Sequence, residues 1–397
     1  MKHSGHSVFI AAFPIMVAFA NSAHAQSWVQ TSAPTNLWYC VASSADGSKV
    51  VALANPGAIY VSLDCGTNWT LTSAPSNAWV SVASSADGHF LAASGGGSVY
   101  TSTDGGSSWT SNTVAWTPNS ANAAFLASSA DGSNLVAAVQ RIGLFTSTNA
   151  GLSWGSNNVP GPFIWLWTAS SADGTQLWAV QDSGPNVFVS TNSGSVWTPT
   201  SALNLNWRAV ATTADGKQAV GVVTLTGVYI TTNSGSTWKK TSAPALNWQA
   251  VASSADGTNL VASAGVLFYG SYHYGPIYTS TNAGASWELT SAPTNTWTSV
   301  ASSADGKRLV AVVHGGGIYI WQGTPAPRLT ITGSGGELLL SWIVPSMNFA
   351  LQESDDLSTT NWTDVVSSPV LNLTNLQNQV KVQPPLSGNS FYRLKLQ

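Results

Sequence analysis

The sequence Ser43-Ser44-Ala45-Asp46-Gly47 decides the fold, because it recurs along most of the chain. Five further copies have their Asp at positions 87, 131, 173, 256 and 305, and a variant, Thr212-Thr213-Ala214-Asp215-Gly216, completes seven copies spaced 41 to 49 residues apart. A Trp lies eight residues before the Asp in every copy except the third, which has Ala123 there. Repeats of this length are typical of β-propeller blades or of a solenoid.

Short β-rich runs lie between the copies. In the first unit they are Val50-Val51-Ala52-Leu53, Ala58-Ile59-Tyr60-Val61 and Thr70-Leu71-Thr72. Each unit holds about four such runs, separated by turn residues. The Asp-Gly pair predicts a tight hairpin, since Gly tolerates the positive φ that such turns require. Four-stranded units that repeat radially predict an all-β fold, a β-propeller, in which only short edges stay open.

A second motif alternates with the first and reads Ser/Thr-x-Asp/Asn-x-Gly-x-x-Trp. Its first copy is Ser62 to Trp69, and later copies end at Trp109, Trp154, Trp197, Trp238 and Trp287. Over about residues 26–322 the chain resembles the Asp-box, or BNR, repeat family of β-propellers. The resemblance implies a structural turn that carries no catalysis. The family includes sialidases and other glycoside hydrolases, sorting-receptor ectodomains and photosystem II assembly factors, so the fold leaves the activity open.

The two ends of the repeat predict how it closes. The seventh unit stops at Trp321 without an Asp-box, whereas the segment Ser27 to Asn36 aligns with Ser286 to Asn295, which spans the end of the sixth Asp-box. We therefore expect the N-terminal segment to supply the outer strand of the last blade and to close a seven-bladed ring. Closure would cover a strand edge whose N–H and C=O groups would otherwise lack partners.

The first 25 residues are typical of a secretory signal peptide. Lys2 precedes an apolar run from Val8 to Ala20, and Ala23-His24-Ala25 fits a cleavage site, so the mature chain would begin at Gln26. This predicts a secreted or periplasmic protein. No second apolar run approaches the ~20 residues of a membrane span, so we expect no membrane insertion.

The C-terminal region has a different character. Residues 323–328 have the composition of a linker, and residues 329–397 lose both motifs. Runs such as Leu338 to Trp342 and Phe391 to Leu394 predict a small β-sandwich, similar to the fibronectin type III-like modules of secreted bacterial proteins. A spacer or export module is the favoured interpretation of this region, with a binding module as the alternative.

Composition excludes several functions. Only 29 of 397 residues are charged and the net charge is −3, which leaves no basic stripe for nucleic acid. The three histidines after residue 25 lie in three units without paired spacing, so we expect no metal and no cofactor.

Cys40 would lie in an innermost strand and Cys65 in a turn near an outer one. Their lateral separation of about 12 Å exceeds the ~7 Å that a disulfide allows, so we expect two thiols.

The carboxylates argue against glycoside hydrolysis. Of eleven acids in the propeller region, seven are the repeated hairpin Asp, and Asp64 and Asp104 belong to Asp-boxes. Asp182 and Glu288 remain, on different faces of different units, whereas a hydrolase places two carboxyl groups ~5–10 Å apart. We therefore predict a non-catalytic, monomeric binding or assembly scaffold for a glycan or protein. A sialidase-like glycoside hydrolase is the alternative, and a structural protein without a ligand is a third.

The ligand site is predicted on the face opposite the two turn motifs, where the connections vary between units. The irregular segment from Tyr269 to Tyr274 is the favoured contact, because repetition cannot explain it. The repeated Trp residues either form an aromatic ring on this face or pack between blades. The candidate ligand-binding residues are Tyr269, Tyr272, His273, Tyr274, His314, Arg141, Asp182, Arg208, Trp38, Trp79, Trp165, Trp207, Trp248 and Trp297.

Overall fold

The computed structural model divides into two compact units, Ser27–Gln322 and one that contains Gly323–Gln397. The described residues are 27–112, 114, 116, 123–157, 159, 163–182, 187–268, 271–322, 329–334, 337–343, 349–356, 361–367, 369–372, 377–383 and 390–396. The expected signal peptide and linker lie outside them, as does Tyr269.

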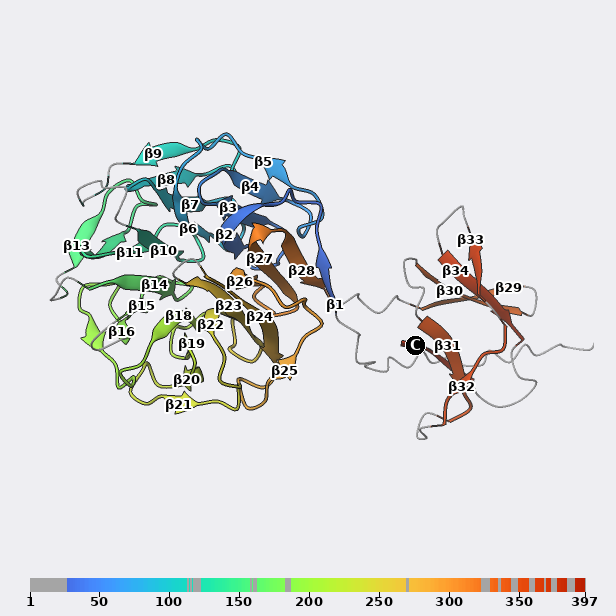
Figure 1. The fold of residues 1–397 in the computed structure, drawn as a ribbon. Helices are drawn as coiled ribbons and strands as arrows, with labels where there is room; N and C mark the ends of the chain where they lie inside the picture. The colour runs from blue at the N-terminus through green and yellow to red at the C-terminus, as the bar shows by residue number, and fades with distance from the viewer. Residues whose placement is uncertain are drawn as a thin grey trace, which may run out of the picture. The chain divides into compact units, whose positions relative to one another are not determined.

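The first unit is built from four-stranded antiparallel groups, without a helix among its described residues (Figure 1). The first four groups are β2 (Asn36–Ser43), β3 (Val50–Ala54), β4 (Ile59–Ser62) and β5 (Thr70–Leu71); β6 (Trp79–Ser84), β7 (Leu91–Gly95), β8 (Ser98–Ser102) and β9 (Thr110–Asn112); β10 (Ala124–Ser128), β11 (Leu135–Val139), β12 (Gly143–Ser147) and β13 (Gly155–Asn157); and β14 (Trp165–Ser170), β15 (Leu177–Gln181), β16 (Val187–Ser190) and β17 (Thr198–Pro199).

The next two groups are β18 (Trp207–Thr212), β19 (Ala219–Val223), β20 (Gly227–Thr231) and β21 (Lys239–Lys240); and β22 (Trp248–Ser253), β23 (Leu260–Phe268), β24 (Ser271–Ser280) and β25 (Glu288–Leu289). A seventh group pairs β26 (Trp297–Ser302), β27 (Arg308–Gly316), β28 (Ile318–Gln322) and β1 (Ser27–Gln30). Figure 1 shows the first strand of each group, here called the inner strand, close to a common axis. This all-β arrangement is typical of a β-propeller.

Backbone hydrogen bonds link the hairpin turns of successive groups. Each turn Ala donates its N–H to the carbonyl of the equivalent Ala one group further on, at 2.7–2.8 Å. The series runs Ala45, Ala86, Ala130, Ala172, Ala214, Ala255, Ala304 and back to Ala45. The last group is therefore bonded to the first through the same turn contact as any neighbouring pair, and β27 of the last group also pairs with β2 of the first.

The N-terminal strand β1 lies beside β28, which is the last strand of this unit in the sequence. It pairs antiparallel with β28, and Trp28 faces Trp321 across the two strands. Their rings stack with centroids 6.3 Å apart, and the backbone N–H of Trp28 donates to Ser291 Oγ at 3.3 Å. The first strand of this unit in the sequence, β1, thus covers the edge of its last strand, β28.

The repeated Trp residues form the core between the groups. Trp38, Trp79, Trp165, Trp207, Trp248 and Trp297 are at most 1% exposed. Trp38, for example, meets Tyr60 edge-on at 5.3 Å. Burying a Trp contributes up to about 5 kcal/mol by area, so these side chains hold the fold together. The interpretation as a ligand-binding aromatic ring is wrong for these six residues, since their rings do not reach the surface.

The third group, which lacks this Trp, fills the space in another way. Trp116 comes from the preceding connection and is 4% exposed. Its ring lies 4.9 Å from Phe145 and 5.6 Å from the Asp-box residue Trp154. A Trp from elsewhere in the sequence therefore supplies the aromatic contact that Ala123 cannot make.

The two cysteines lie where the strand pattern predicts. Cys40 is buried in the inner strand β2, and Cys65 lies in the turn between β4 and β5. No disulfide joins these two described residues, as expected.

The C-terminal unit holds two antiparallel sheets. One consists of β29 (Thr330–Ser334), β30 (Glu337–Ile343), β34 (Gln377–Val382) and β33 (Val370–Asn372), and the other of β32 (Thr363–Asp364), β31 (Phe349–Ser354) and β35 (Phe391–Leu396). Both contribute to one core, with Leu340, Trp342 and Val380 from the first sheet and Leu351 and Tyr392 from the second.

Candidate ligand-binding face

The two repeated motifs share one face of the propeller unit. In each of the six Asp-box groups, an Asp-box N–H donates to a carbonyl of the hairpin turn in the same group, at 2.7–2.9 Å. The first such bond runs from Cys65 N–H to Ser48 O. We call this side the turn face. The opposite side, which carries the connections between the second and third strands and between successive groups, is the connection face.

Carboxylates on the turn face are engaged in holding their own turns. The Ser44 hydroxyl and the Ser48 backbone N–H donate to Asp46 Oδ1 at 2.6 and 3.0 Å. These bonds, led by that of Ser44, lower the pKa of Asp46 to about 2. In the first Asp-box, the Ser62 hydroxyl and the Asn68 N–H donate to Asp64 Oδ1 at 2.8 Å each. Such carboxylates stabilise turns and are not arranged for catalysis.

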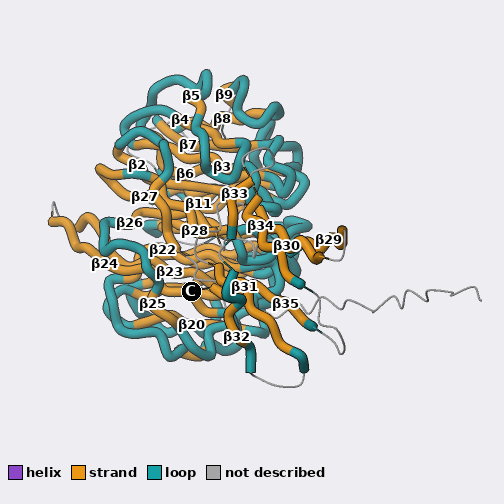
Figure 2. Tube along the Cα trace, turned by 90° about the vertical axis from the view of Figure 1, so that its right-hand side faces the viewer, coloured by secondary structure: helices purple, strands orange, loops and turns teal. Residues whose placement is uncertain are grey.

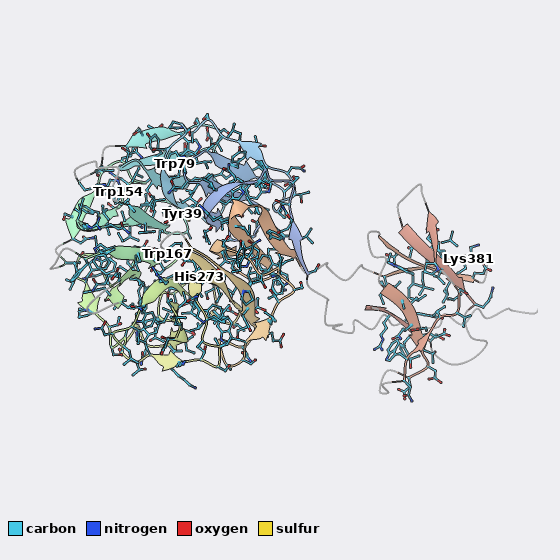
Figure 3. All side chains as sticks on the ribbon, viewed as in Figure 1. Tyr39, Trp79, Trp154, Trp167, His273 and Lys381 are labelled. Carbon is cyan, nitrogen blue, oxygen red and sulfur yellow. The ribbon has the colours of Figure 1, made fainter. Side chains whose placement is uncertain are left out.

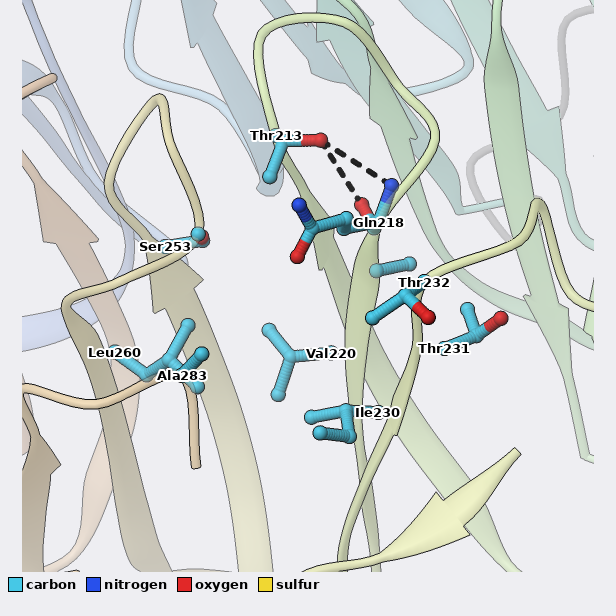
Figure 4. A pocket seen from close by; sticks show the side chains of 11 residues that line it. Thr213, Gln218, Val220, Ile230, Thr231, Thr232, Ser253, Leu260 and Ala283 are labelled. Carbon is cyan, nitrogen blue, oxygen red and sulfur yellow. Dashed lines mark hydrogen bonds between the residues drawn. The ribbon is translucent and has the colours of Figure 1, made fainter. Parts of the chain in front are cut away.

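A crevice opens on the turn face between the fifth and sixth groups (Figure 4). Val220, Ile230 and Leu260 line it with apolar atoms, and Thr213 and Gln218 with polar ones. Equivalent crevices lie between the first and second groups and between the seventh and first. Because the feature recurs with the repeat, we interpret it as a packing gap and not as a dedicated site.

β-Bulges mark the connection face at the start of the inner strands. In six groups the pairing of the inner strand skips the residue directly after the repeated Trp. The third group lacks this Trp, and β10 pairs with β11 without a shift. A bulge adds a residue that opposes no partner and re-aims its side chain. The six bulged residues, here called the bulge ring, are Tyr39, Val80, Leu166, Arg208, Gln249 and Thr298.

Trp167 occupies the axis beneath this ring. The equivalent positions in five other groups hold small residues, namely Cys40, Ser81, Ala209, Ala250 and Ser299. Trp167 packs against core clusters that involve the first, second, third, fifth and sixth groups as well as its own. Only a side chain at the axis can reach so many groups, and Figure 3 shows Trp167 near the centre. Small neighbours leave the volume that this large ring fills.

Tyr39 and Arg208 come from non-adjacent groups of the bulge ring. Their inner strands, β2 and β18, belong to the first and fifth groups, which are not neighbours. Burial of the Tyr39 hydroxyl raises its pKa, and the positive charge of Arg208 offsets part of this rise. Arg208 Nε donates to Thr224 Oγ1 at 3.2 Å, which orients the guanidinium. Tyr39 is 36% exposed, and Arg208 is half-buried.

The segment expected as an irregular loop is instead a β-ribbon. β23 and β24 continue beyond their neighbours and pair Gly265 with Tyr274 and Val266 with His273. Figure 2 shows this ribbon standing out from the body of the unit. His273 and Tyr274 are exposed, while the Tyr272 side chain lies outside the described residues. Apolar and aromatic residues in both segments, Val266 to Phe268 and Tyr272 to Tyr274, favour strand pairing, and this explains the difference.

The other predicted residues are spread over the connection face. Arg141 and Asp182 are both exposed. Their backbone N–H groups donate to Phe163 O and Ile164 O at 2.8 and 3.1 Å, so the two residues flank the same connection. His314 is half-buried where β27 meets β2, and its N–H donates to Thr296 O at 3.1 Å. Only Arg208 of these charged candidates belongs to an inner strand.

The remaining acids do not form a pair. Asp182 follows the second strand of the fourth group, and Glu288 lies exposed in β25, the outer strand of the sixth. Among the residues that the structure describes, no three His, Cys, Asp or Glu side chains gather as a metal site would require.

Sequence analysis missed five members of the bulge ring and the axial Trp167; the five are Tyr39, Val80, Leu166, Gln249 and Thr298. A signal for the ring exists in the sequence, since the residue after each repeated Trp varies between units while the Trp itself is constant. Its meaning depends on the bulge, which the repeat does not reveal.

No protein-family model and no curated protein matches this sequence. Solved structures do share the fold. "YCF48 bound to D1 peptide" has a TM-score of 0.58 at 14% identity, covering 78% of this chain and 100% of that one. The GH74 enzyme of Niastella koreensis and the GH74 xyloglucanase of Xanthomonas campestris have TM-scores of 0.59 and 0.58 at 16% and 15% identity. Each covers 80% of this chain, which spans 59% of theirs.

These similarities establish a β-propeller fold, since identities are too low to carry an activity. The neighbours include a protein with a bound peptide as well as glycoside hydrolases. In the described part of the chain, no helix has the length and apolar character needed to cross a membrane.

Proposed function

We propose that this chain is a secreted, non-catalytic seven-bladed Asp-box propeller that acts as a binding scaffold for a protein or glycan ligand. The N-terminal strand closes the ring, and the C-terminal unit is a β-sandwich similar to fibronectin type III modules. The closed series of turn hydrogen bonds and the pairing of β1 with β28 support this architecture. The protein would act as a monomer after removal of residues 1–25.

The distribution of functional groups carries the binding proposal. Nine of the eleven propeller acids stabilise repeated turns on the turn face. The connection face instead carries side chains that vary between groups, namely the bulge ring, and the exposed ribbon with His273 and Tyr274. Exposed aromatic and polar side chains of this kind suit the recognition of a ligand.

The alternative function, glycoside hydrolysis, has no comparable support from the arrangement of carboxyl groups. A glycoside hydrolase needs two carboxyl groups on either side of one bond. Asp182 and Glu288 are the only propeller acids outside the turn motifs, and they lie in different groups, one after a second strand and the other in an outer strand. The GH74 neighbours support this alternative only through their fold.

The test is a glycan array and a peptide array probed with the exported full chain, together with a hydrolysis assay on every glycan bound. We expect binding without turnover. The double variant Tyr272→Ala/His273→Ala should weaken that binding at least about tenfold, a loss of ~1.4 kcal/mol, with a nearly unchanged melting temperature.

Leu225→Ala provides the matched control. Leu225 is 67% exposed in the corresponding connection of the fifth group, on the same face. Its substitution should leave binding intact. Hydrolysis of a bound glycan, or full affinity in the double variant, would contradict the proposed function or move its site.

A further inference from the structure

We infer that the ribbon formed by β23 and β24 binds an extended peptide segment of the ligand as an additional β-strand. The contact is the inner edge of the ribbon, defined as the backbone of Gly265–Phe268 on the side of β23 where β22 lies within the propeller. This inference rests on the proposed function and deepens it, because it selects a protein ligand and names the backbone groups that would hold it.

No strand covers the inner edge. The sixth group has the strand order β22, β23, β24 and β25, and its first strand lies closest to the axis (Figure 1). β22 begins at Trp248, which pairs with Ala264, so β23 continues for four residues beyond the start of its inner neighbour. Among the described residues, no strand pairs with these four on this side. Their outward N–H and C=O groups are therefore open to a further strand.

The direction of one hydrogen bond shows which backbone groups point to the inner edge. Gly265 N–H donates to Asn247 O at 2.9 Å, away from β24. In an antiparallel pair, residues whose N–H and C=O groups point outward alternate with residues that bond to the partner strand. The pairing runs without a shift from Gly265 to Phe268, so Leu267 directs both its N–H and its C=O to the inner edge.

The base of the ribbon is fixed on both sides. Asn247 holds its inner side, and on its outer side Gly275 and Asn295 exchange backbone hydrogen bonds at 2.9 and 3.0 Å. A Cβ atom on Gly265 or Gly275 would overlap backbone atoms of the segment that faces it. The ribbon therefore leaves the propeller in a defined direction (Figure 2), and an edge that is already ordered binds a strand at a lower entropy cost.

The inner edge lacks the protection that open strand edges usually have. Proteins protect such edges with charged residues, with proline or by keeping the strand very short. From Ala264 to Gly275 the sequence contains no Asp, Glu, Lys, Arg or Pro. The outer strands of the seven groups are instead only two to four residues long, and one of them is Lys239–Lys240. An unprotected edge of this kind is a template for pairing with another chain.

A peptide fits this edge better than a glycan or a second copy of the chain. A glycan has no N–H and C=O groups at the spacing of a β-strand, so it cannot continue the sheet. An edge of four residues buries far less than the roughly 1,200 Å² that a stable protein interface requires, so it would not hold a second copy by itself. A peptide can follow the edge and place alternate side chains over the connection face.

The experiment tests whether binding depends on the peptide backbone. The peptide array is prepared twice, once with ordinary backbones and once with every backbone nitrogen methylated, and both are probed with the exported full chain. We expect binding to the ordinary array only, because methylation removes the N–H donors and leaves the side chains unchanged. Calorimetry on the peptide bound best should show at least about a tenfold loss of affinity on methylation.

Leu267→Pro removes the N–H that the inner edge offers to a peptide. The ribbon can still form in this variant, because the N–H of Leu267 points away from β24. We expect peptide binding to weaken at least about tenfold. Leu267→Ala is the matched control, since it keeps the N–H and changes only the side chain, and its affinity should stay nearly unchanged. Melting curves show that each variant is folded.

Hydrogen exchange provides a second measurement if Leu267→Pro does not fold. In the unchanged protein, exchange of the Leu267 amide should slow when the peptide binds, because the amide gains a partner. Exchange at an unchanged rate in the complex would place the peptide elsewhere.

Equal binding to the two arrays, full affinity in Leu267→Pro or an equal loss in Leu267→Ala would overturn the inference. Self-association that Leu267→Pro abolishes would identify a second copy as the occupant and would also overturn it. If only glycans bind, the proposed function stands and the strand-pairing site is wrong. If no array reveals a ligand, the proposed function fails as well.

Discussion

At the residue scale, the Asp-box carries backbone strain at its fourth position. Five of the six copies have a non-glycine residue there with φ between 52° and 62°, namely Cys65, Ala150, Ser193, Ser234 and Ala283. The remaining copy has Gly105 with φ of 68°. The left-handed conformation costs an L-residue about 1–2 kcal/mol, whereas glycine adopts it readily.

Ala283→Gly should therefore raise the free energy of unfolding by about 0.5–1 kcal/mol, which is the relieved strain minus the added entropy of the unfolded chain. Chemical denaturation measures the change. Ala285→Gly, two residues further in the same turn and outside the positive-φ region, should destabilise or change nothing. A lower stability of Ala283→Gly would show that the turn does not hold strain at this position.

At the scale of elements, inner and outer strands differ in what they do. Inner strands bring residues from different groups to one axis, as Tyr39 of the first group and Trp167 of the fourth show. The outer strand β1 instead couples the two ends of the propeller sequence. It places Trp28 at 6.3 Å from Trp321 and at 6.2 Å from Trp297, so one short strand completes an aromatic cluster.

Deleting residues 26–36 should lower the melting temperature by about 10 °C or more, because losing the Trp28 contacts alone costs ~3–5 kcal/mol and 1 kcal/mol shifts a large domain by ~2 °C. Differential scanning calorimetry measures this effect. Trp28→Ala tests the same contact if the truncated chain does not fold, and Val29→Ala, whose side chain is 56% exposed, is the control with little expected change. An unchanged melting curve after the deletion would refute closure by β1.

At the scale of the whole molecule, the repeat lowers the pKa of the aspartate in turn after turn. The pKa values of the seven hairpin aspartates and of Asp64 and Asp104 are all lowered from the ordinary 3.8. In six of the hairpins the neighbouring Ser or Thr hydroxyl is the largest cause. For Asp46 and Asp104 the values fall to about 2.

Acid should therefore destabilise the propeller over a narrow range. A carboxyl group whose pKa is lower in the folded state stabilises it above the unfolded pKa, and this contribution is lost as pH falls through the folded pKa. We expect the melting temperature to stay level from neutral pH to about pH 5 and to drop between about pH 4 and pH 2. Melting curves across this range measure it, and a level curve down to pH 2 would contradict the role of the turn aspartates.

Local chemistry explains what the sequence by itself determined. The all-β class, the strands between motifs and the hairpin and Asp-box turns follow from short-range turn geometry and from motifs that occur in nearly every unit. A feature encoded in neighbouring residues, and repeated, can be recognised without the fold.

Only the tertiary structure decided which side chains are buried and which are exposed on the connection face. Burial of Trp38 and its equivalents depends on neighbouring groups that pack over them, and the ribbon around His273 depends on pairing between two strands. The position of Tyr39 and Trp167 near the axis depends on bulges in strands of two different groups. Contacts between distant parts of the sequence exist only after the ring has formed, so no local pattern specifies them.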